Sequence, residues 1–372
     1  MGGVRRSRWL VPWKKSLVKP AIYHCISRVV DRRFVFGDAE REQFRIFMRM
    51  YENFTGCRLL SYCIMSNHFH ILLEVPPMPE GGISDEELLK RLRVIYSDSV
   101  VSIVEKELAE ARAKGLTNHA EQIHQRYTYR MHDLSQFMKT VLQRMTRWYN
   151  LSHQRKGTLW EERFKSVIVE SGVAARTMAA YIDLNPVRAG MVSDPAQYRW
   201  SSYGEAIGGG ARGNGKKARE GLVRACLSHR GAGFEAEKWK EAAKIYRNMM
   251  GLALERKSGR AGVEVSAAKQ KKLAAVTKQS LQGGGKPDPN EVKQDDNNTI
   301  LPEMRMAEML LHRIRYFSDG AVIGSKAFVN EAFASARERF SAKRKDGARK
   351  MRGSGTAAKD TLWSARDLRL RV

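Results

Sequence analysis

Two histidines separated by one residue give this sequence its clearest chemical feature. They lie in Asn67-His68-Phe69-His70, at the start of the apolar run HFHILLEV, which predicts a β-strand. In a strand, residues two apart point to the same face, so the two imidazoles project together and Phe69 points to the other side. Two imidazoles placed in this way can chelate one divalent ion. A pair of surface or hydrogen-bonded histidines would show the same pattern, so a metal site also needs a third ligand and a reacting group.

A tyrosine and an asparagine further along the chain could supply both. In the predicted helix VAARTMAAYIDLNPV, Tyr181 and Asn185 are four residues apart and therefore neighbours on one helix face. Asn185 offers a neutral oxygen to a metal, and Tyr181 offers a hydroxyl beside it. Taken alone, a tyrosine at helical spacing is typical of a core and Asn-Pro is typical of a helix end. The pair therefore gains a chemical meaning only together with His68 and His70.

The elements that must position these residues follow from the apolar patterns. They are a strand at 21–30, a helix from Asp38, two strands joined at Ser66-Asn67, a charged helical insertion, a helix from Asp133, a strand in TLWEERFKSVIVES and the Tyr181 helix. This order predicts an α+β fold, a ferredoxin-like split βαβ sandwich with an antiparallel sheet. His24 lies on the first strand, which is central in such a sheet, and we expect it to be a hydrogen-bonded structural histidine near the site.

Composition shifts suggest a division of the chain into four parts. Residues 1–20 form a basic arm, and residues 21–205 form the catalytic domain, with the helical insertion at about 76–132. Residues 206–300 are expected to be a basic linker region that is partly disordered, because the stretch at 280–298 is rich in Gly, Pro, Asp and Asn. Residues 301–372 are expected to be a basic C-terminal helical module or tail.

The overall charge favours a polyanionic partner. Lys and Arg number 66 against 40 Asp and Glu, a formal net charge of +26 among 372 residues. No apolar run is long enough to cross a membrane. The four cysteines show no C-x-x-C spacing, which favours reduced core cysteines and a cytoplasmic location over a disulfide frame or a zinc site.

Three motifs, in this order, resemble a known family. The stretches MSNHFHILLE, GTLWEERFKS and YIDLNPVRAGMV, the last followed by YRWSSY, are similar to the single-tyrosine HUH transposases of bacterial insertion sequences, and most to their REP-associated branch. The resemblance covers about Ala21 to Tyr203. It implies that His68 and His70 bind a Mg²⁺ or Mn²⁺ ion, that Asn185 is the third ligand and that Tyr181 is the nucleophile.

The resemblance also implies a reaction and a partner. Such an enzyme cuts single-stranded DNA at hairpins, of repeats or of insertion-sequence ends, and keeps the phosphodiester energy in a 5′-phosphotyrosine. A free 3′-hydroxyl can then rejoin the strand without ATP. A bacterial, nucleoid-associated location follows, and a homodimer is left open. Relatives usually carry a glycine after the arginine of the first strand, where this chain has Val29, so the turn at that point is expected to differ.

Basic residues near these motifs could hold DNA. Arg163 and Lys165 in WEERFKS and Arg188 beyond the catalytic helix are the predicted phosphate contacts. Several aromatic residues could stack on unpaired bases or could fill the core, and the sequence does not separate these roles; they are Trp160, Phe164 and Trp200.

Three other functions share parts of the pattern. One is a domesticated nuclease that processes repeat hairpins of its host genome. Another is a non-catalytic nucleic-acid-binding protein that uses the sheet as a platform, although such a protein needs neither the histidine pair nor Tyr181. The third is a metal-dependent hydrolase, which would require further histidine or aspartate ligands on later strands.

Overall fold

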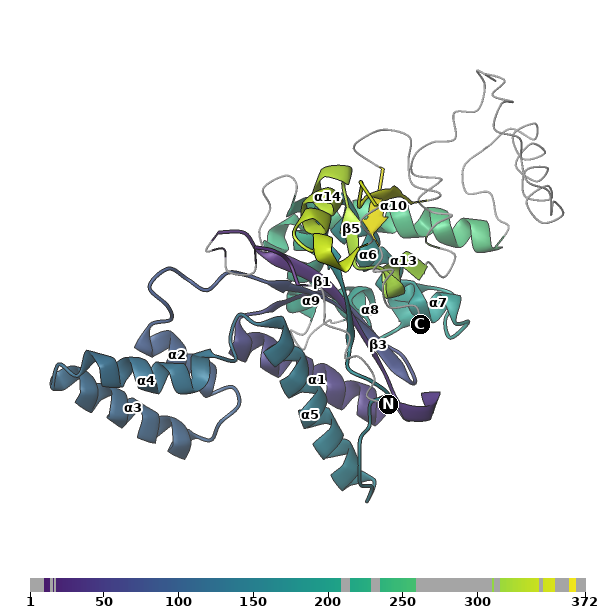
Figure 1. The fold of residues 1–372 in the computed structure, drawn as a ribbon. Coiled ribbons are helices and arrows are strands. Elements are labelled where there is room, and N and C mark those ends of the chain that lie inside the picture. Colours follow the sequence, from purple (N-terminus) through teal and green to yellow (C-terminus); the bar gives the residue numbers. More distant parts are fainter. Residues whose placement is uncertain are drawn as a thin grey trace, which may run out of the picture.

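A seven-stranded sheet forms the centre of the protein (Figure 1). The structure is a computed structural model that describes residues 10–13, 16, 18–208, 215–228, 235–258, 310, 315–340, 344–351 and 361–365. The strands are β1 (Ala21–Arg28), β2 (Arg58–Ile64), β3 (His68–Val75), β4 (Lys165–Val169), β5 (Val322–Gly324), β6 (Arg349–Lys350) and β7 (Trp363–Ala365). The α-helices are α1 (Asp38–Thr55), α2 (Asp85–Leu92), α3 (Asp98–Ala113), α4 (Thr117–Thr128), α5 (Leu134–Ser152), α6 (Val173–Asp183), α7 (Asn185–Arg188), α8 (Ser202–Gly208), α9 (Gly215–Leu227), α10 (Trp239–Ser258), α13 (Arg315–Asp319) and α14 (Lys326–Ala334).

The strand order confirms the predicted fold class. The order is β2-β3-β1-β4-β5-β7-β6. β1 pairs antiparallel with both β3 and β4, and β2 pairs antiparallel with β3. This arrangement of the first four strands, together with α1 and α5 between them in the chain, is the split βαβ, ferredoxin-like sheet of an α+β protein.

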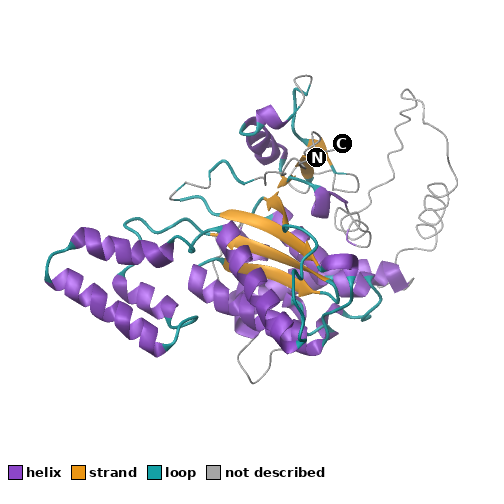
Figure 2. Cartoon of the chain, turned by 60° about the horizontal axis from the view of Figure 1, so that its bottom comes forward, coloured by secondary structure: helices purple, strands orange, loops and turns teal. Residues whose placement is uncertain are grey.

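The two faces of the sheet are covered by different helices, as Figure 2 shows. Side chains alternate along each strand, so successive residues of β3 belong to different cores. Phe69 and Ile71 pack in the core that contains α1 and α5. Leu72 packs in the second core, which contains α6, α9 and part of α10. Residues of β3 with even numbers therefore face α6.

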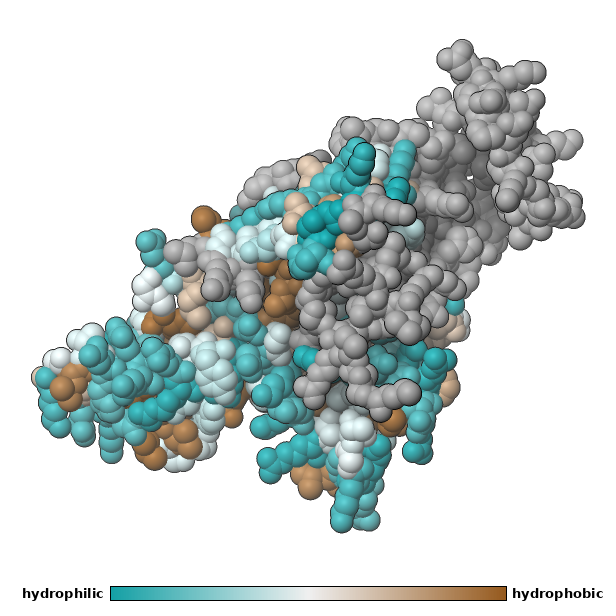
Figure 3. Space-filling view, in the orientation of Figure 1, coloured by the Kyte–Doolittle hydropathy of each residue, from teal (hydrophilic) through white to brown (hydrophobic). Residues whose placement is uncertain are grey.

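The predicted insertion is a group of three helices, α2 to α4. Ser84 begins it as an N-cap, because its hydroxyl accepts a hydrogen bond from the amide of Glu87. The helices extend away from the sheet in Figure 1, and their surface is largely hydrophilic in Figure 3. Asp85 ties the group together, since it binds both Arg112 and His124.

The C-terminal part of the chain is built into the same sheet, which differs from the predicted division. α9 packs against β2 so closely that a Cβ on Gly221 would collide with the carbonyl oxygen of Leu59. β5 pairs parallel with β4, and β7 and β6 continue the sheet from it. The reason is that apolar residues of α9, α10 and β5 complete the second core. Neither 205/206 nor 300/301 is therefore a boundary between separate bodies, and the expected disordered stretch at 280–298 lies outside the described residues.

Two local predictions need correction. The strand expected in TLWEERFKSVIVES begins only at Lys165, although Trp160 forms an isolated bridge with Val29. Pro186 does not simply end the Tyr181 helix. It lies in the first turn of α7, where a missing amide hydrogen costs nothing, so the chain continues as a second short helix. In the described part of the chain, no helix is both long and apolar enough to cross a bilayer.

Candidate active site

The register of the sheet brings three histidines to the face that α6 covers. His68 lies opposite Arg28 and His70 lies opposite Ile26, while His24 lies opposite Leu72. Directly paired residues of neighbouring strands point to the same face, so His24, His68 and His70 share it. The imidazole rings of His68 and His70 have their centroids 5.2 Å apart, as do those of His24 and His70. The predicted projection of His68 and His70 to one side is confirmed.

A chain of hydrogen bonds fixes the tautomers of two of these histidines. Nδ1 of His24 lies 2.7 Å from the carbonyl oxygen of Phe317, and Nε2 of His24 lies 3.0 Å from Nδ1 of His70. A carbonyl can only accept, so Nδ1 of His24 must carry the proton and donate it. In the neutral ring, Nε2 of His24 then accepts a hydrogen bond from Nδ1 of His70. The lone pair of His70 is thereby left on Nε2, the nitrogen that could bind a metal.

Burial keeps the imidazole rings of His24 and His70 neutral. His24 and His70 are buried. Loss of hydration lowers the pKa of His24 to about 4. Burial also lowers the pKa of His70 well below its usual range, and the neighbouring rings of His68 and His24 and the guanidinium groups of Arg188 and Arg28 act in the same direction. A neutral imidazole is the form in which a histidine can bind a metal ion.

His68 is oriented in the same manner by the residue before it. Nδ1 of His68 lies 2.7 Å from Oδ1 of Asn67. The amide nitrogen of Asn67 donates to the carbonyl oxygen of Arg32, which identifies Oδ1 as the atom that faces the imidazole. Nδ1 of His68 is therefore a donor, and in the neutral ring the lone pair is on Nε2. Hydrogen bonds of this kind orient metal-binding histidines in many proteins.

Tyr181 reaches the same place from α6. Its ring centroid lies 6.3 Å from that of His70, with the rings nearly perpendicular. Phe317 of α13 covers another side of Tyr181, with the ring centroids 4.7 Å apart. Only 3% of Tyr181 is exposed. The sequence suggested either a core tyrosine or a nucleophile, and the structure places a buried tyrosine directly against the histidine pair.

Arg188 contacts Tyr181 rather than the surface. Its guanidinium lies 4.0 Å from the centroid of the Tyr181 ring, and it donates hydrogen bonds to the carbonyl oxygens of Tyr181 and Leu310. Burial lowers the pKa of Arg188 from its usual value, while the neighbouring Tyr181 acts against this. Two of its donors are thus engaged by main-chain carbonyls next to the tyrosine.

Asn185 holds the end of the Tyr181 helix. Its amide nitrogen donates to the carbonyl oxygens of Tyr181 and Ile182, at 3.3 and 3.1 Å. These bonds satisfy carbonyls that a helix end leaves without partners. Because they use the nitrogen, the side-chain oxygen of Asn185 points away from them.

A buried carboxyl fixes the same helix end on the other side. Asp183 accepts hydrogen bonds from the hydroxyl of Tyr246 (2.6 Å), the amide of Tyr203 (3.0 Å) and the hydroxyl of Ser61 (3.4 Å). Burial raises the pKa of Asp183 to about 7, although these hydrogen bonds oppose the shift. The sequence offered no signal for this role, because the three partners come from distant parts of the chain.

The donors at this site suit a divalent ion. Among the described residues, no group of three His, Cys, Asp or Glu side chains could hold a metal. The two imidazole nitrogens of His68 and His70 would therefore need a ligand of another type, such as the amide oxygen of Asn185 or an oxygen of the substrate. A mixed nitrogen and oxygen set of this kind fits Mg²⁺ or Mn²⁺ better than a structural zinc site.

Positive charge surrounds the histidines. Arg28 is directly opposite His68, and Lys165 is directly opposite Ile26, which in turn lies opposite His70. Lys165 is exposed, and so is Arg163 in the bend before β4. The exposure of Lys165 and Arg163 is compatible with contacts to phosphates, which stay a prediction, whereas Arg28 is a basic residue near His68 that only the strand register reveals.

The aromatic residues of WEERFKS belong to the core. Trp160 is buried, its indole donates to the carbonyl oxygen of Leu142, and its ring lies 5.5 Å from that of Phe69. Phe164 is buried as well. Trp200 is half-buried beneath the guanidinium of Arg41. Of the two roles that the sequence left open, core packing is the observed one for Trp160 and Phe164.

The turn after β1 avoids the need for a glycine. Val29 has φ −68° and ψ 143°, an ordinary extended conformation. The left-handed positions fall instead on Asp31 and Arg32, both with φ 56°. A non-glycine residue in this region costs about 1–2 kcal/mol, so the surrounding contacts must hold the turn in place.

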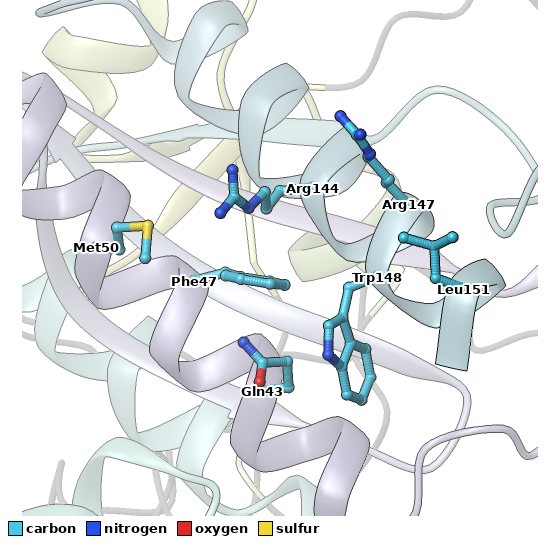
Figure 4. Close-up of a pocket in the computed structure, with 7 residues that line it drawn as sticks. All are labelled: Gln43, Phe47, Met50, Arg144, Arg147, Trp148 and Leu151. Carbon is cyan, nitrogen blue, oxygen red and sulfur yellow. The ribbon is translucent and has the colours of Figure 1, made fainter. Parts of the chain in front are cut away.

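A groove on the described surface lies away from the histidines. This groove of about 600 Å³ runs between α1 and α5, on the other side of the sheet from the histidines. Figure 4 shows its lining residues, which are Gln43, Phe47, Met50, Arg144, Arg147, Trp148 and Leu151. The cluster of His24, His68, His70 and Tyr181, in which only His68 is partly exposed, is therefore separate from this groove.

The segment that holds the histidine pair is similar to a known family. Residues 17–100 match the family model described as "Transposase IS200 like". The matched segment includes β1, α1, β2 and β3 and ends before Tyr181; its 84 residues (17 to 100) are less than a quarter of the 372. The match confirms the resemblance to insertion-sequence transposases.

One solved structure is also similar. It is that of a REP-associated tyrosine transposase bound to a REP hairpin, with 12% identity, a TM-score of 0.31, and coverage of 56% of this chain and 86% of that chain. No curated protein matches the sequence.

Proposed function

We propose that this chain, which carries the IS200-like transposase segment at residues 17–100, is a transposase that cuts and rejoins single-stranded DNA through Tyr181. The observation that carries the proposal is the contact between Tyr181 and His70, whose Nδ1 is held by His24. A binding protein has no need for a buried tyrosine against two histidines whose lone pairs are set by hydrogen bonds.

Tyr181 would act as the nucleophile of a transesterification. Its hydroxyl oxygen would attack the phosphorus of a DNA phosphodiester, forming the O–P bond of a 5′-phosphotyrosine as the bond from phosphorus to the 3′-oxygen breaks. The proton lost by the phenol balances the proton gained by the leaving 3′-oxygen. A second 3′-hydroxyl could reverse the step and join a new strand, because the phosphodiester energy is retained.

His68 and His70 would hold a divalent ion, with Asn185 as the third protein ligand. When bound, Mg²⁺ or Mn²⁺ would polarise an oxygen of the scissile phosphate and orient the phosphate for in-line attack. His24 and Asn67 would keep Nε2 of each ligand histidine unprotonated, through the bonds to their Nδ1 atoms. Arg188 would stabilise the negative charge that develops on the tyrosine oxygen, since its guanidinium lies against the ring.

The substrate that the family resemblance implies is single-stranded DNA with a hairpin. Lys165, Arg163 and Arg28 would bind its phosphates, and the net charge of +26 would attract it from solution. A nuclease that processes repeat hairpins of its host would use the same chemistry, so the position of the gene between hairpins decides between these two roles.

The test is a covalent adduct. The protein is incubated with single-stranded DNA hairpins from the flanks of its own gene, in the presence of Mn²⁺ or Mg²⁺, and separated under denaturing conditions. We expect a protein band shifted by the mass of the cleaved strand. Absence of any adduct on these hairpins, with folded protein that binds them, would contradict the proposal.

A further inference from the structure

One large apolar side chain in the loop after β1 is almost fully in solvent. Phe34 is 83% exposed, although nearly every other phenylalanine of the described chain is buried. It follows Arg32 and Arg33, which are also exposed. Within the described residues, neither arginine forms a salt bridge with an acidic side chain. An unpaired aromatic ring beside two unneutralised cations is a combination that protein packing does not explain.

Backbone conformation and hydrogen bonds define the loop that carries this ring. Asp31 and Arg32 both adopt the left-handed conformation. Hydrogen bonds secure the loop at each end, from the amide of Val29 to the carbonyl of Asn67 and from the amide of Phe36 to the carbonyl of Ser66. Strained backbone that is maintained by such contacts is characteristic of functional sites.

The same loop is joined to the histidine pair through one side chain. Asn67 donates from its amide nitrogen to the carbonyl oxygen of Arg32 (2.8 Å) and accepts at its amide oxygen from Nδ1 of His68 (2.7 Å). One asparagine therefore sets both the loop that carries Phe34 and the ring of a proposed metal ligand. The main chain at Arg32, two residues before Phe34, is therefore joined to His68 through Asn67.

We propose that the loop 31–35 is a subsite for an unpaired nucleotide of the DNA substrate, adjacent to the scissile phosphate. The ring of Phe34 stacks on the base, and Arg32 and Arg33 bind the flanking phosphates. Stacking on an aromatic ring requires an unpaired base, whereas arginine contacts to phosphate do not. The loop thus contributes to the preference for single strands, and this inference rests on the proposed DNA-cleaving function.

The distinguishing measurement is the affinity of the full chain for two DNAs of equal length, a single-stranded oligonucleotide and a blunt duplex, by fluorescence anisotropy. Phe34→Ala is expected to weaken single-strand binding about tenfold and to leave duplex binding unchanged. Phe34→Trp is expected to restore the affinity, and its additional fluorescence, relative to wild type, to be quenched by the single strand. Exchange of both arginines for Gln should lower the salt dependence of single-strand binding by about 0.7 per arginine in log–log slope.

Ile103→Ala is the matched control, because Ile103 is an exposed apolar residue on α3, in the helical insertion. It should change neither affinity. Equal single-strand affinities of Phe34→Ala and wild type would overturn the inference, and so would an equal loss for single strand and duplex. A loss of self-association with no change in DNA binding would instead identify the loop as a contact between copies, which also overturns it. Formation of the covalent adduct is measured separately, at saturating DNA. If the wild-type protein forms no adduct, the proposed DNA-cleaving function is refuted. If the adduct forms but Phe34→Ala binds the single strand as wild type does, only the subsite is refuted.

Discussion

Nε2 of His24 lies 3.0 Å from Nδ1 of His70, and the other nitrogen of His24 lies 2.7 Å from the carbonyl oxygen of Phe317. Because the carbonyl oxygen of Phe317 can only accept, it determines which nitrogen carries the proton in the His24 ring and, through it, in the His70 ring. Phe317 of α13, 293 positions from His24, thereby sets which nitrogen of His70 carries the lone pair.

Removal of the hydrogen bond between His24 and His70, here called the relay, should weaken metal binding. His24→Phe preserves a ring of similar size but leaves Nδ1 of His70 without its acceptor. We expect the affinity for Mn²⁺ to fall about 10- to 100-fold, as for other partners of metal-binding histidines. Titration followed by electron paramagnetic resonance measures the affinity. His119→Ala, at an exposed position of α4, should bind as wild type does, and equal binding by His24→Phe would show that the relay has no such role.

Arg188 should matter for both stability and reactivity. Arg188→Lys keeps the positive charge but cannot stack on Tyr181 while donating to two carbonyls in the same plane. We expect the free energy of unfolding to decrease by about 1.5–3 kcal/mol in urea denaturation, and the adduct to form more slowly. Arg93→Lys, at the exposed C-cap of α2, is the control. A variant with wild-type stability and adduct rate would refute this assignment.

Asp183 should make stability fall as the pH rises. Its pKa is about 7 in the folded chain because of burial, against about 3.9 in an unfolded chain, so the folded state binds the proton more tightly. The contribution of Asp183 to the free energy of unfolding is fully present below about pH 4 and is lost as the pH rises through about 7. The total decrease is about 4 kcal/mol. Asp183→Asn stays neutral and should lack this loss.

The comparison requires urea denaturation of both proteins at several values between pH 5 and pH 8. Other titrating groups, such as His24, affect both proteins alike. The difference in free energy of unfolding should therefore shift in favour of Asp183→Asn as the pH rises. A difference that is constant with pH would be inconsistent with a buried carboxyl of raised pKa.

The basic residues before and within β4 should act through phosphates. Arg163 and Lys165 are exposed, and neutralising either one should lower the salt dependence of single-strand binding by about 0.7 in log–log slope. Lys106→Gln, on the exposed face of α3, should change nothing. Slopes of Arg163→Gln and Lys165→Gln that equal the wild-type slope would exclude these two contacts.

Much of the site could be predicted from short patterns. The alternation of HFHILLEV predicted the two histidines on one face, and the order of elements predicted a central first strand, which the structure shows as β1 between β3 and β4. These features depend on local chemistry and on a few topological rules, so they are visible in a single sequence.

The remaining features depend on contacts between distant segments. Two consecutive hydrogen bonds, from His24 to Phe317 and from His70 to His24, join α13 to β1 and β3. Asp183 similarly accepts a hydrogen bond from Tyr246 of α10. The position of β5 beside β4 similarly requires knowledge of the packed core. The region after residue 205 was expected to be separate because its linkers are polar, but its short apolar stretches complete the second core.

The most direct test of the account is to identify the residue that becomes linked to DNA. The adduct formed with a hairpin strand and Mn²⁺ is digested with protease and nuclease and analysed by mass spectrometry. The account predicts a nucleotide joined through its 5′-phosphate to Tyr181, and no adduct for Tyr181→Phe at unchanged DNA affinity and stability. An adduct on another residue, or one that persists in Tyr181→Phe, would contradict it.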